Sequence, residues 1–113
     1  SQIAFAPLGK TIVVAAAAAA PAGIQAPVTS NSDQQNAGQY RVINSGIVTV
    51  FLGFGQSAAE ATANAVAPIA GTPSKAIVLV AGAVEVLRFN QATFFSGLAS
   101  AATTVYITPG QGL

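Results

Sequence analysis

The chain has 113 residues, of which 52% are hydrophobic and only 6% are charged, whereas about 25% are charged in an average soluble domain. Its four basic and three acidic residues give a net charge of +1, and the basic residues are scattered, so the sequence shows no electrostatic footprint for nucleic acid. The lack of cysteine and histidine excludes disulfides and thiolate or imidazole metal sites. A surface with so few charges provides little electrostatic repulsion against association with other protein molecules. We therefore expect copies of the chain or a larger assembly to cover it, with a neutral monomer as the alternative.

The first candidate element is TIVVAAAAAAP, residues 11–21, which allows three interpretations. A secretory signal needs a positive region before its apolar run, but nine non-basic residues precede Lys10. Six alanines favour a helix, yet they make fewer than two turns, which is too short to be stable without packing. Two valines lead into the run, and Pro21 closes it and favours extended backbone in the residue before it. We therefore expect an extended strand or arm whose small side chains pack closely against a sheet or a neighbouring subunit. The longest apolar run, residues 11–24, is broken by Pro21 and is also shorter than the roughly 20 residues that a membrane span requires.

Short β-strands are predicted for the rest of the chain, because valine, isoleucine and threonine are abundant and Gly or Pro recurs about every ten residues. The polar stretch TSNSDQQNAG, residues 29–38, reads as a loop. It ends a low-complexity N-terminal arm or strand, residues 1–38, and precedes a β-sandwich core, residues 39–113, within one domain overall. The predicted strands are residues 10–16, 39–44, 47–54, 75–80, 83–89 and 103–108, with weaker patterns at 24–28, 59–63 and 93–95. This number of strands predicts an all-β fold, an antiparallel two-sheet sandwich of jelly-roll type.

Three strand patterns have consequences for the surface. The segment 47–52 has apolar residues on both faces, as expected of a strand covered on both sides. Glu85 lies beside an apolar ladder and is expected at a solvated strand edge, the alternative being an intersubunit ion pair with Arg41 or Arg88. Phe94 and Phe95 are adjacent and point to opposite faces of a strand, so one can enter the core while the other reaches towards a partner.

Two motifs resemble nucleotide-binding loops, and both are rejected. AFAPLGKT, residues 4–11, nearly matches the P-loop, but only three residues precede it, its first glycine is an alanine, and Pro7 removes an amide. IVTVFLGFGQSA, residues 47–58, reads as a strand followed by G-x-G-x-x-A. It lacks the acidic residue about 20 positions later that would hold a ribose. Its glycines are instead expected to ease a turn or a bulge.

No catalytic, cofactor-binding or metal-binding residue is expected. Ser–His–Asp chemistry needs a histidine, and Glu60 with Glu85 is the only plausible pair of carboxylates. Asp33 is the one other acid, which argues against a carboxylate metal site. We therefore expect a protein that is not an enzyme. The aromatic residues are expected to pack in the core and in subunit interfaces, although they could form a stacking platform for sugars or bases: Phe5, Tyr40, Phe51, Phe54, Phe89, Phe94, Phe95 and Tyr106.

The stretches YRVINSGIVTVFLGFG, VAGAVEVLRF and TTVYITPGQGL, which begin at residues 40, 80 and 103, resemble the small decoration, or cement, proteins of tailed bacteriophage capsids. The resemblance extends over residues 39–113 and rests on a pattern of strands and turns. It implies a subunit of a dimer or trimer that binds the major capsid protein on the outside of the head and bridges neighbouring capsomers. The expected location is the outer surface of the virion, after synthesis in the host cytoplasm, where removal of an initiator methionine would leave Ser1 first.

Two other functions are kept as alternatives. A phage tail, fibre-collar or pilin-like subunit would assemble end to end, and a small carbohydrate-binding module would present exposed aromatic residues in a row. No nucleic acid, membrane or cofactor is expected as a partner of the chain under any of the three interpretations.

Overall fold

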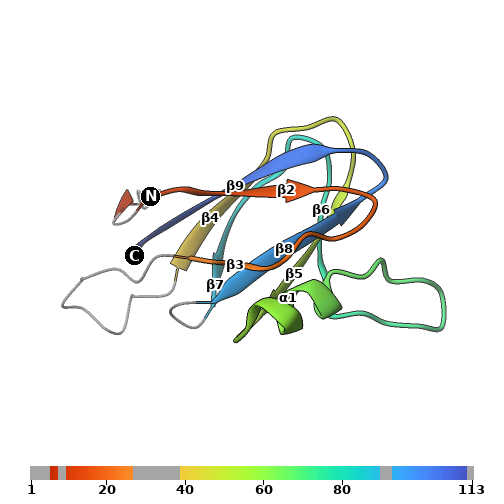
Figure 1. Cartoon of the computed structure of the whole chain (residues 1–113). Coiled ribbons are helices and arrows are strands. Elements are labelled where there is room, and N and C mark those ends of the chain that lie inside the picture. The colour runs from red at the N-terminus through yellow and green to blue at the C-terminus, as the bar shows by residue number, and fades with distance from the viewer. Residues whose placement is uncertain (1–5, 8–9, 27–38, 90–92, 112–113) are drawn as a thin grey trace.

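The computed structural model describes residues 6–7, 10–26, 39–89 and 93–111, and within them it is mostly β. Two antiparallel sheets form two layers, and a short helix, α1 (Ala58–Asn64), lies against one of them (Figure 1). Sheet A contains β1 (Ala6–Pro7), β2 (Ile12–Ala16), β9 (Thr103–Gln111), β4 (Gln39–Asn44) and β7 (Val84–Arg88). Sheet B contains β3 (Ile24–Gln25), β8 (Phe94–Ala99), β5 (Val50–Gly55) and β6 (Ile77–Leu79). The described part of the chain contains no helix long and apolar enough to cross a membrane.

The strands pair in a nested order. β2 pairs with β9, β3 with β8, β4 with β7, and β5 with β6, all antiparallel. The pairs β4–β9 and β5–β8 complete the two sheets. Among the described residues, the successive nested strand pairs therefore alternate between the two sheets. The expected all-β, two-sheet antiparallel fold is confirmed.

The core lies between the two sheets and is made by alternate residues of the strands, as the two-residue period of a strand requires. Its fully or almost fully buried members are Val14, Ala16, Ala26, Tyr40, Val42, Val50, Leu52, Leu79, Phe95, Ala99, Val105 and Ile107. At one end of the core, Phe95 packs edge-on against Tyr40 and Phe89, with ring centroids 5.5 and 5.0 Å apart. Phe54 meets Phe89 at 5.0 Å and extends this aromatic cluster.

The alanine-rich segment begins as a strand and then crosses between the sheets. Ile12–Ala16 pairs with β9, and Val14 and Ala16 are buried in the core. At Ala17 the chain reaches sheet B, where its carbonyl oxygen accepts a hydrogen bond of 2.9 Å from the amide of Ala99 in β8. The expectation of extended structure is thus correct for the first part of the run. The pairing that the structure shows is with β9 of the same chain.

The strand predicted at residues 59–63 is wrong, because these residues form α1. Ser57 and Glu60 form a variant of the capping box: the Ser57 hydroxyl accepts from the Glu60 amide at 3.1 Å, and the Glu60 carboxylate accepts at 2.8 Å from the amide of Gln56, the residue before the N-cap. The helix then consists mainly of alanine, the residue with the highest helix propensity. The S-x-x-E spacing was the sequence signal for this helix.

Two glycines of β5 let α1 lie directly on sheet B. A Cβ atom on Gly53 would come within 2.3 Å of the Ala61 carbonyl oxygen, and one on Gly55 within 2.5 Å of the Glu60 carboxylate. Both glycines lie inside β5, and neither has a positive φ. Their role is therefore close packing of a helix on a strand, in place of the turn or bulge that was expected.

A buried asparagine at the end of β4 sets the boundaries of the next strands. The Nδ2 amide of Asn44 donates to the carbonyl oxygens of Val48, Leu79 and Val80 at 2.9, 3.0 and 3.1 Å. Its Oδ1 accepts from the amide of Gly46 at 3.1 Å. These bonds hold residues 45–49 in a loop, so β5 starts at Val50 and not at residue 47 as predicted.

The alternating pattern predicted for residues 47–52 holds for the residues of β5 and for Val48, which packs against the core from the preceding loop. Val50 and Leu52 are buried in the core, and Phe51 is half-buried on the outer face of sheet B. Ile47 lies in the preceding loop with 93% of its side chain exposed, so its expected burial is wrong.

Candidate protein-binding surface

The outer face of sheet A carries an apolar row that crosses four strands. Val13 of β2 lies opposite Tyr106 of β9, Tyr106 opposite Ile43 of β4, and Ile43 opposite Val84 of β7. Their neighbours Val14, Val105 and Val42 are fully buried, so the row points away from the core. Val13, Tyr106 and Val84 are 48, 40 and 52% exposed. We call these four residues the sheet A row.

Two threonines, an arginine and a valine flank one side of the sheet A row. On one side, Thr108 lies opposite Arg41, which in turn lies opposite the exposed Val86. The Thr108 hydroxyl shares a hydrogen bond of 2.7 Å with that of Thr11. Apolar side chains in a row with a thin polar margin are typical of a surface that another protein covers.

The register between strands creates the sheet A row, and sequence analysis missed it. Each of these strands has apolar residues on both of its faces, a pattern that indicates only that both faces are covered. The register decides which residues of neighbouring strands lie side by side. It depends on pairings such as β2 with β9, about 90 positions apart, for which the sequence offers no local signal.

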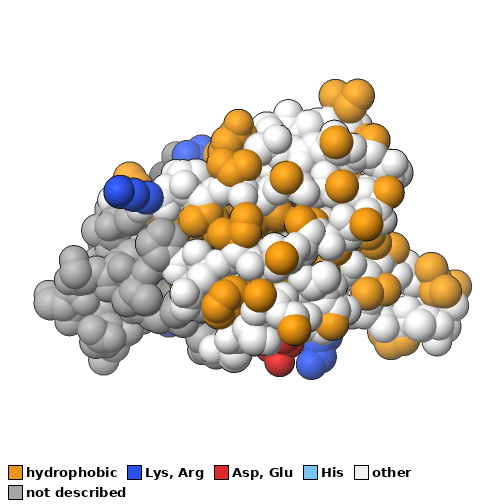
Figure 2. All heavy atoms as spheres, in the orientation of Figure 1, with side chains coloured by type: hydrophobic (Ala, Val, Ile, Leu, Met, Phe, Trp, Pro, Cys, Tyr) orange, Lys and Arg blue, Asp and Glu red, His pale blue; other side chains and the backbone are white. Residues whose placement is uncertain are grey.

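A second uncharged region lies along β2 and β3, the segment that faces the viewer in Figure 1. Residues 11–26 contain no charged side chain. Figure 2 shows this side of the molecule with apolar side chains spread over it and the charged ones near its margins. The exposed members of this segment include Val13, Ala15, Ala18, Ala19, Ala22 and Ile24.

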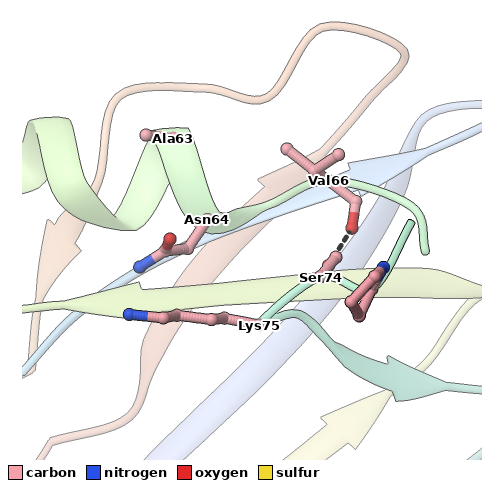
Figure 3. Close-up of a pocket in the computed structure, with 6 residues that line it drawn as sticks. Ala63, Asn64, Val66, Ser74 and Lys75 are labelled. Atoms are coloured by element: carbon pink, nitrogen blue, oxygen red, sulfur yellow. Dashed lines mark hydrogen bonds between the residues drawn. The ribbon is translucent and has the colours of Figure 1, made fainter. Parts of the chain in front are cut away.

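One open groove of about 290 Å³ lies between the end of α1 and the segment before β6 (Figure 3). Its polar groups already serve the fold: the Ser74 hydroxyl donates to the Val66 carbonyl oxygen at 2.5 Å, and the Asn64 amide donates to the Phe54 carbonyl oxygen at 2.9 Å. Lys75 is the one charged residue that lines it, and it is exposed. A groove with a single exposed lysine has too few convergent polar groups to fix a small ligand.

The structure adds a reason to reject each nucleotide motif. Residues 4–5 and 8–9 of the P-loop-like stretch lie outside the described residues, but Lys10 and Thr11 lead into the strand β2, whereas a P-loop leads into a helix.

The second motif does form a strand, a turn and a helix, β5 followed by α1. However, both neighbours of β5 run antiparallel to it, and the Glu60 carboxylate accepts a hydrogen bond beside the helix N-terminus, where a bound phosphate would need the amides.

The two acidic residues that the structure describes lie at different sheets. Glu60 is on α1 against sheet B, and Glu85 is on β7 at the edge of sheet A. Glu85 is exposed, and its register opposite Val42 places it on the other face of the sheet from Arg41. Asp33 lies outside the described residues, within which no group of three potential metal ligands occurs.

The aromatic residues are distributed mainly in the interior. Phe95 is buried in the core while the adjacent Phe94 is half-buried on the opposite face, as expected from the alternation of a strand. Tyr106 is the single exposed aromatic residue in the described part of the chain, and Phe5 lies outside it. Comparisons with protein-family models, with curated proteins and with solved structures found no match to this chain.

Proposed function

We propose that this protein is a structural, non-enzymatic virion subunit that decorates the outside of a tailed-phage capsid and bridges neighbouring capsomers. The observation that carries the proposal is the sheet A row, an exposed apolar line across four strands of a domain with seven charged residues in all. A face of this kind is suited to covering another protein, here the major capsid protein, and it offers no group for chemistry.

The magnitude of the contact explains why a repetitive partner suits it. Full burial of a valine-sized side chain contributes about 1.5–3 kcal/mol, so completing the burial of the half-exposed row contributes roughly 4 kcal/mol. Association of two proteins costs an estimated 4–15 kcal/mol. The row alone would therefore bind weakly, and stable attachment needs several subunits that act together on a symmetric lattice.

We further propose that the sandwich is of jelly-roll type. The nested pairs β2–β9, β3–β8, β4–β7 and β5–β6 support this, because a jelly roll is a long antiparallel hairpin wrapped into two sheets. This fold suits a shell protein, since it leaves the outer face of sheet A open on one side of the molecule, while α1 covers part of sheet B on the other.

Three valine-to-lysine variants test the proposal on undecorated heads of the phage that encodes the chain. Val84→Lys places a charge in the sheet A row, and Val78→Lys places one on the outer face of sheet B at a similar exposure, 45% against 52%. The wild-type protein and Val78→Lys should cosediment with the heads and raise their melting temperature, while Val84→Lys should lose most of its binding. The third variant, Val13→Lys, alters the end of the sheet A row on the edge strand β2, should also weaken shell binding, and is used below to test self-association. Failure of the wild-type protein to bind heads would refute the function, and equal binding by all variants would refute the role of the row.

A pilin-like or tail subunit is the second candidate. It is favoured by one observation: β2 and β7 lie at opposite edges of sheet A, so that β2 of one copy could pair with β7 of the next and continue as a filament. Electron micrographs of the pure protein distinguish the two, because filaments support this candidate. The carbohydrate-binding alternative needs exposed aromatic residues in a row, and the described residues provide Tyr106 alone.

A further inference from the structure

We propose that β2 is a dimerisation strand, which pairs antiparallel with β2 of a second copy about a two-fold axis. This inference deepens the proposed function, of which self-association is a part, by naming the edge and the symmetry. It starts from the position of β2 in sheet A. On one side β2 pairs with β9, and on its other side no strand of the described residues pairs with it. An edge strand presents unpaired amide and carbonyl groups, which another strand satisfies best.

The β2 edge lacks the features that protect edge strands in monomers. Such edges usually carry charges, proline or a bulge, or are very short. β2 has five residues, IVVAA, with neither charge nor proline. The opposite edge of the sheet, β7, has the sequence VEVLR and therefore carries two charges in five residues. In sheet B, the edge strands β3 and β6 have only two and three residues. Of the edges that the structure describes, β2 is thus the longest uncharged one.

The end of β2 and the segment after it let two copies approach closely. Ala15, Ala18, Ala19 and Ala22 are exposed on the same uncharged segment, and their methyl groups leave the backbone accessible on a side where charge is confined near the margins (Figure 2). A second copy brings the same small groups. With a net charge of +1 per chain, the two copies repel each other little.

Antiparallel self-pairing is also sterically favourable. With the axis at Val14, Val13 of one copy lies opposite Ala15 of the other, and Ile12 lies opposite Ala16, so each large side chain meets a small one. Lys10 precedes β2 by two residues, so the two Lys10 side chains lie at opposite ends of the paired strands, about eight residues or roughly 27 Å apart. This distance exceeds the Debye length of about 8–10 Å at physiological salt.

The resulting dimer would carry a doubled binding face. The two-fold axis of an antiparallel strand pair is perpendicular to the sheet, so both copies present the outer face of sheet A on the same side. The two sheet A rows would then lie on one continuous sheet. Two weak contacts on one rigid body bind a lattice far more tightly than either does alone.

The test compares the dimer dissociation constants of the wild-type protein, Val13→Lys, Val84→Lys and Val78→Lys by analytical ultracentrifugation. All three substituted side chains are exposed, and the fold of each variant is checked by circular dichroism. Val13→Lys places two charges close to the axis and should raise the dissociation constant at least tenfold. The other two variants should dimerise as the wild-type protein does. A wild-type monomer, a Val13→Lys dimer of unchanged affinity, or a loss of dimer in Val84→Lys alone would overturn the proposal.

A cross-linking experiment does not depend on weakening the dimer. Because the chain has no cysteine, single cysteines can be introduced at Val13 or Ala15 and, as matched controls, at Val84 or Val86. A short bismaleimide should link two copies through the β2 positions and leave the β7 positions unlinked; the reverse result would refute β2 pairing. Shell binding is measured separately, so that cross-linking at β2 without binding to heads refutes only the function, and binding without β2 cross-links refutes only this dimer.

Discussion

Replacing Asn44 by aspartate should destabilise the protein strongly at neutral pH and much less in acid. Asn44 is fully buried, and its Nδ2 amide donates to three carbonyl oxygens, those of Val48, Leu79 and Val80, at 2.9–3.1 Å. These bonds connect the end of β4 to the next loop and to the end of β6. A carboxylate oxygen in the place of the amide nitrogen would donate no hydrogen bond to them and would repel them instead.

The cost follows from the number of bonds that are lost. The amide has two hydrogens, and each buried acceptor left without a partner costs about 1–3 kcal/mol. The expected loss is therefore about 3–5 kcal/mol at pH 7, a large part of the 5–15 kcal/mol that stabilises a typical domain. For a chain of this size, 1 kcal/mol corresponds to about 4 °C in melting temperature, so Tm should fall by roughly 12–20 °C.

The dependence on pH distinguishes this mechanism from a simple loss of packing. Burial and the facing carbonyl oxygens should raise the pKa of the introduced carboxyl in the folded state above its usual value of about 3.9. Below about pH 4 the group is protonated in both states and can donate one hydrogen bond, so the loss of stability is smallest there. The loss grows as the pH rises through the folded-state pKa.

The assay is urea unfolding of the wild-type protein and of Asn44→Asp at several pH values, with the difference between them taken at each pH. Ser45→Ala is the control, since the neighbouring hydroxyl makes one exposed hydrogen bond to the Thr104 carbonyl oxygen, and its loss should cost about 0.5 kcal/mol at every pH. A loss below about 1 kcal/mol for Asn44→Asp at pH 7, or one that does not vary with pH, would refute the reasoning.

The other predictions concern the helix on sheet B and the core, and thermal unfolding measures each. Gly53→Ala should cost at least about 2 kcal/mol, because the new Cβ would lie 2.3 Å from the Ala61 carbonyl oxygen and must displace α1. In contrast, Gly82→Ala meets no atom within 4 Å and should cost only the 1–2 kcal/mol of its positive φ of 76°; equal losses at the two glycines would contradict close packing of α1. Ser57→Ala removes the N-cap and should cost about 1 kcal/mol, and no loss would show that the capping box is dispensable. Phe95→Ala should cost about 3–5 kcal/mol, and a loss below half of that would place Phe95 outside the aromatic centre of the core.

The sequence predicts the strands well where period and turn signals coincide. The segment 39–44 becomes β4 with the same bounds, since its apolar alternation ends at an asparagine and a glycine. The prediction of a strand at residues 59–63 was wrong, because helix capping by Ser57 and Glu60 and the helix propensity of alanine outweighed the β-rich sequence around them. The predicted burial of Ile47 in a strand was wrong because Asn44 holds residues 45–49 in a loop. One of the hydrogen bonds of Asn44 reaches β6, about 35 residues along the chain, and such a contact has no local signal in the sequence.

The sequence predicts that the protein has an apolar surface, but it does not predict which residues form it. Low charge and apolar residues on both strand faces predict a surface that another protein covers, and the structure exposes an apolar row on sheet A. Val13 and Tyr106 are more than 90 residues apart, and only the pairing of β2 with β9 brings them together. The alanine-rich run was expected to contact a sheet or another subunit, and the structure shows the first through β9. Contact with another subunit is the proposal of β2 pairing, at the edge of β2 with which no described strand pairs.

A density map of phage heads incubated with the purified protein tests the proposal of capsid decoration most directly. We expect additional density on the outer surface, at the joints between capsomers, into which the two-sheet sandwich fits with the outer face of sheet A towards the shell. Heads without additional density after incubation with excess protein, or density in which sheet A faces solvent, would contradict it.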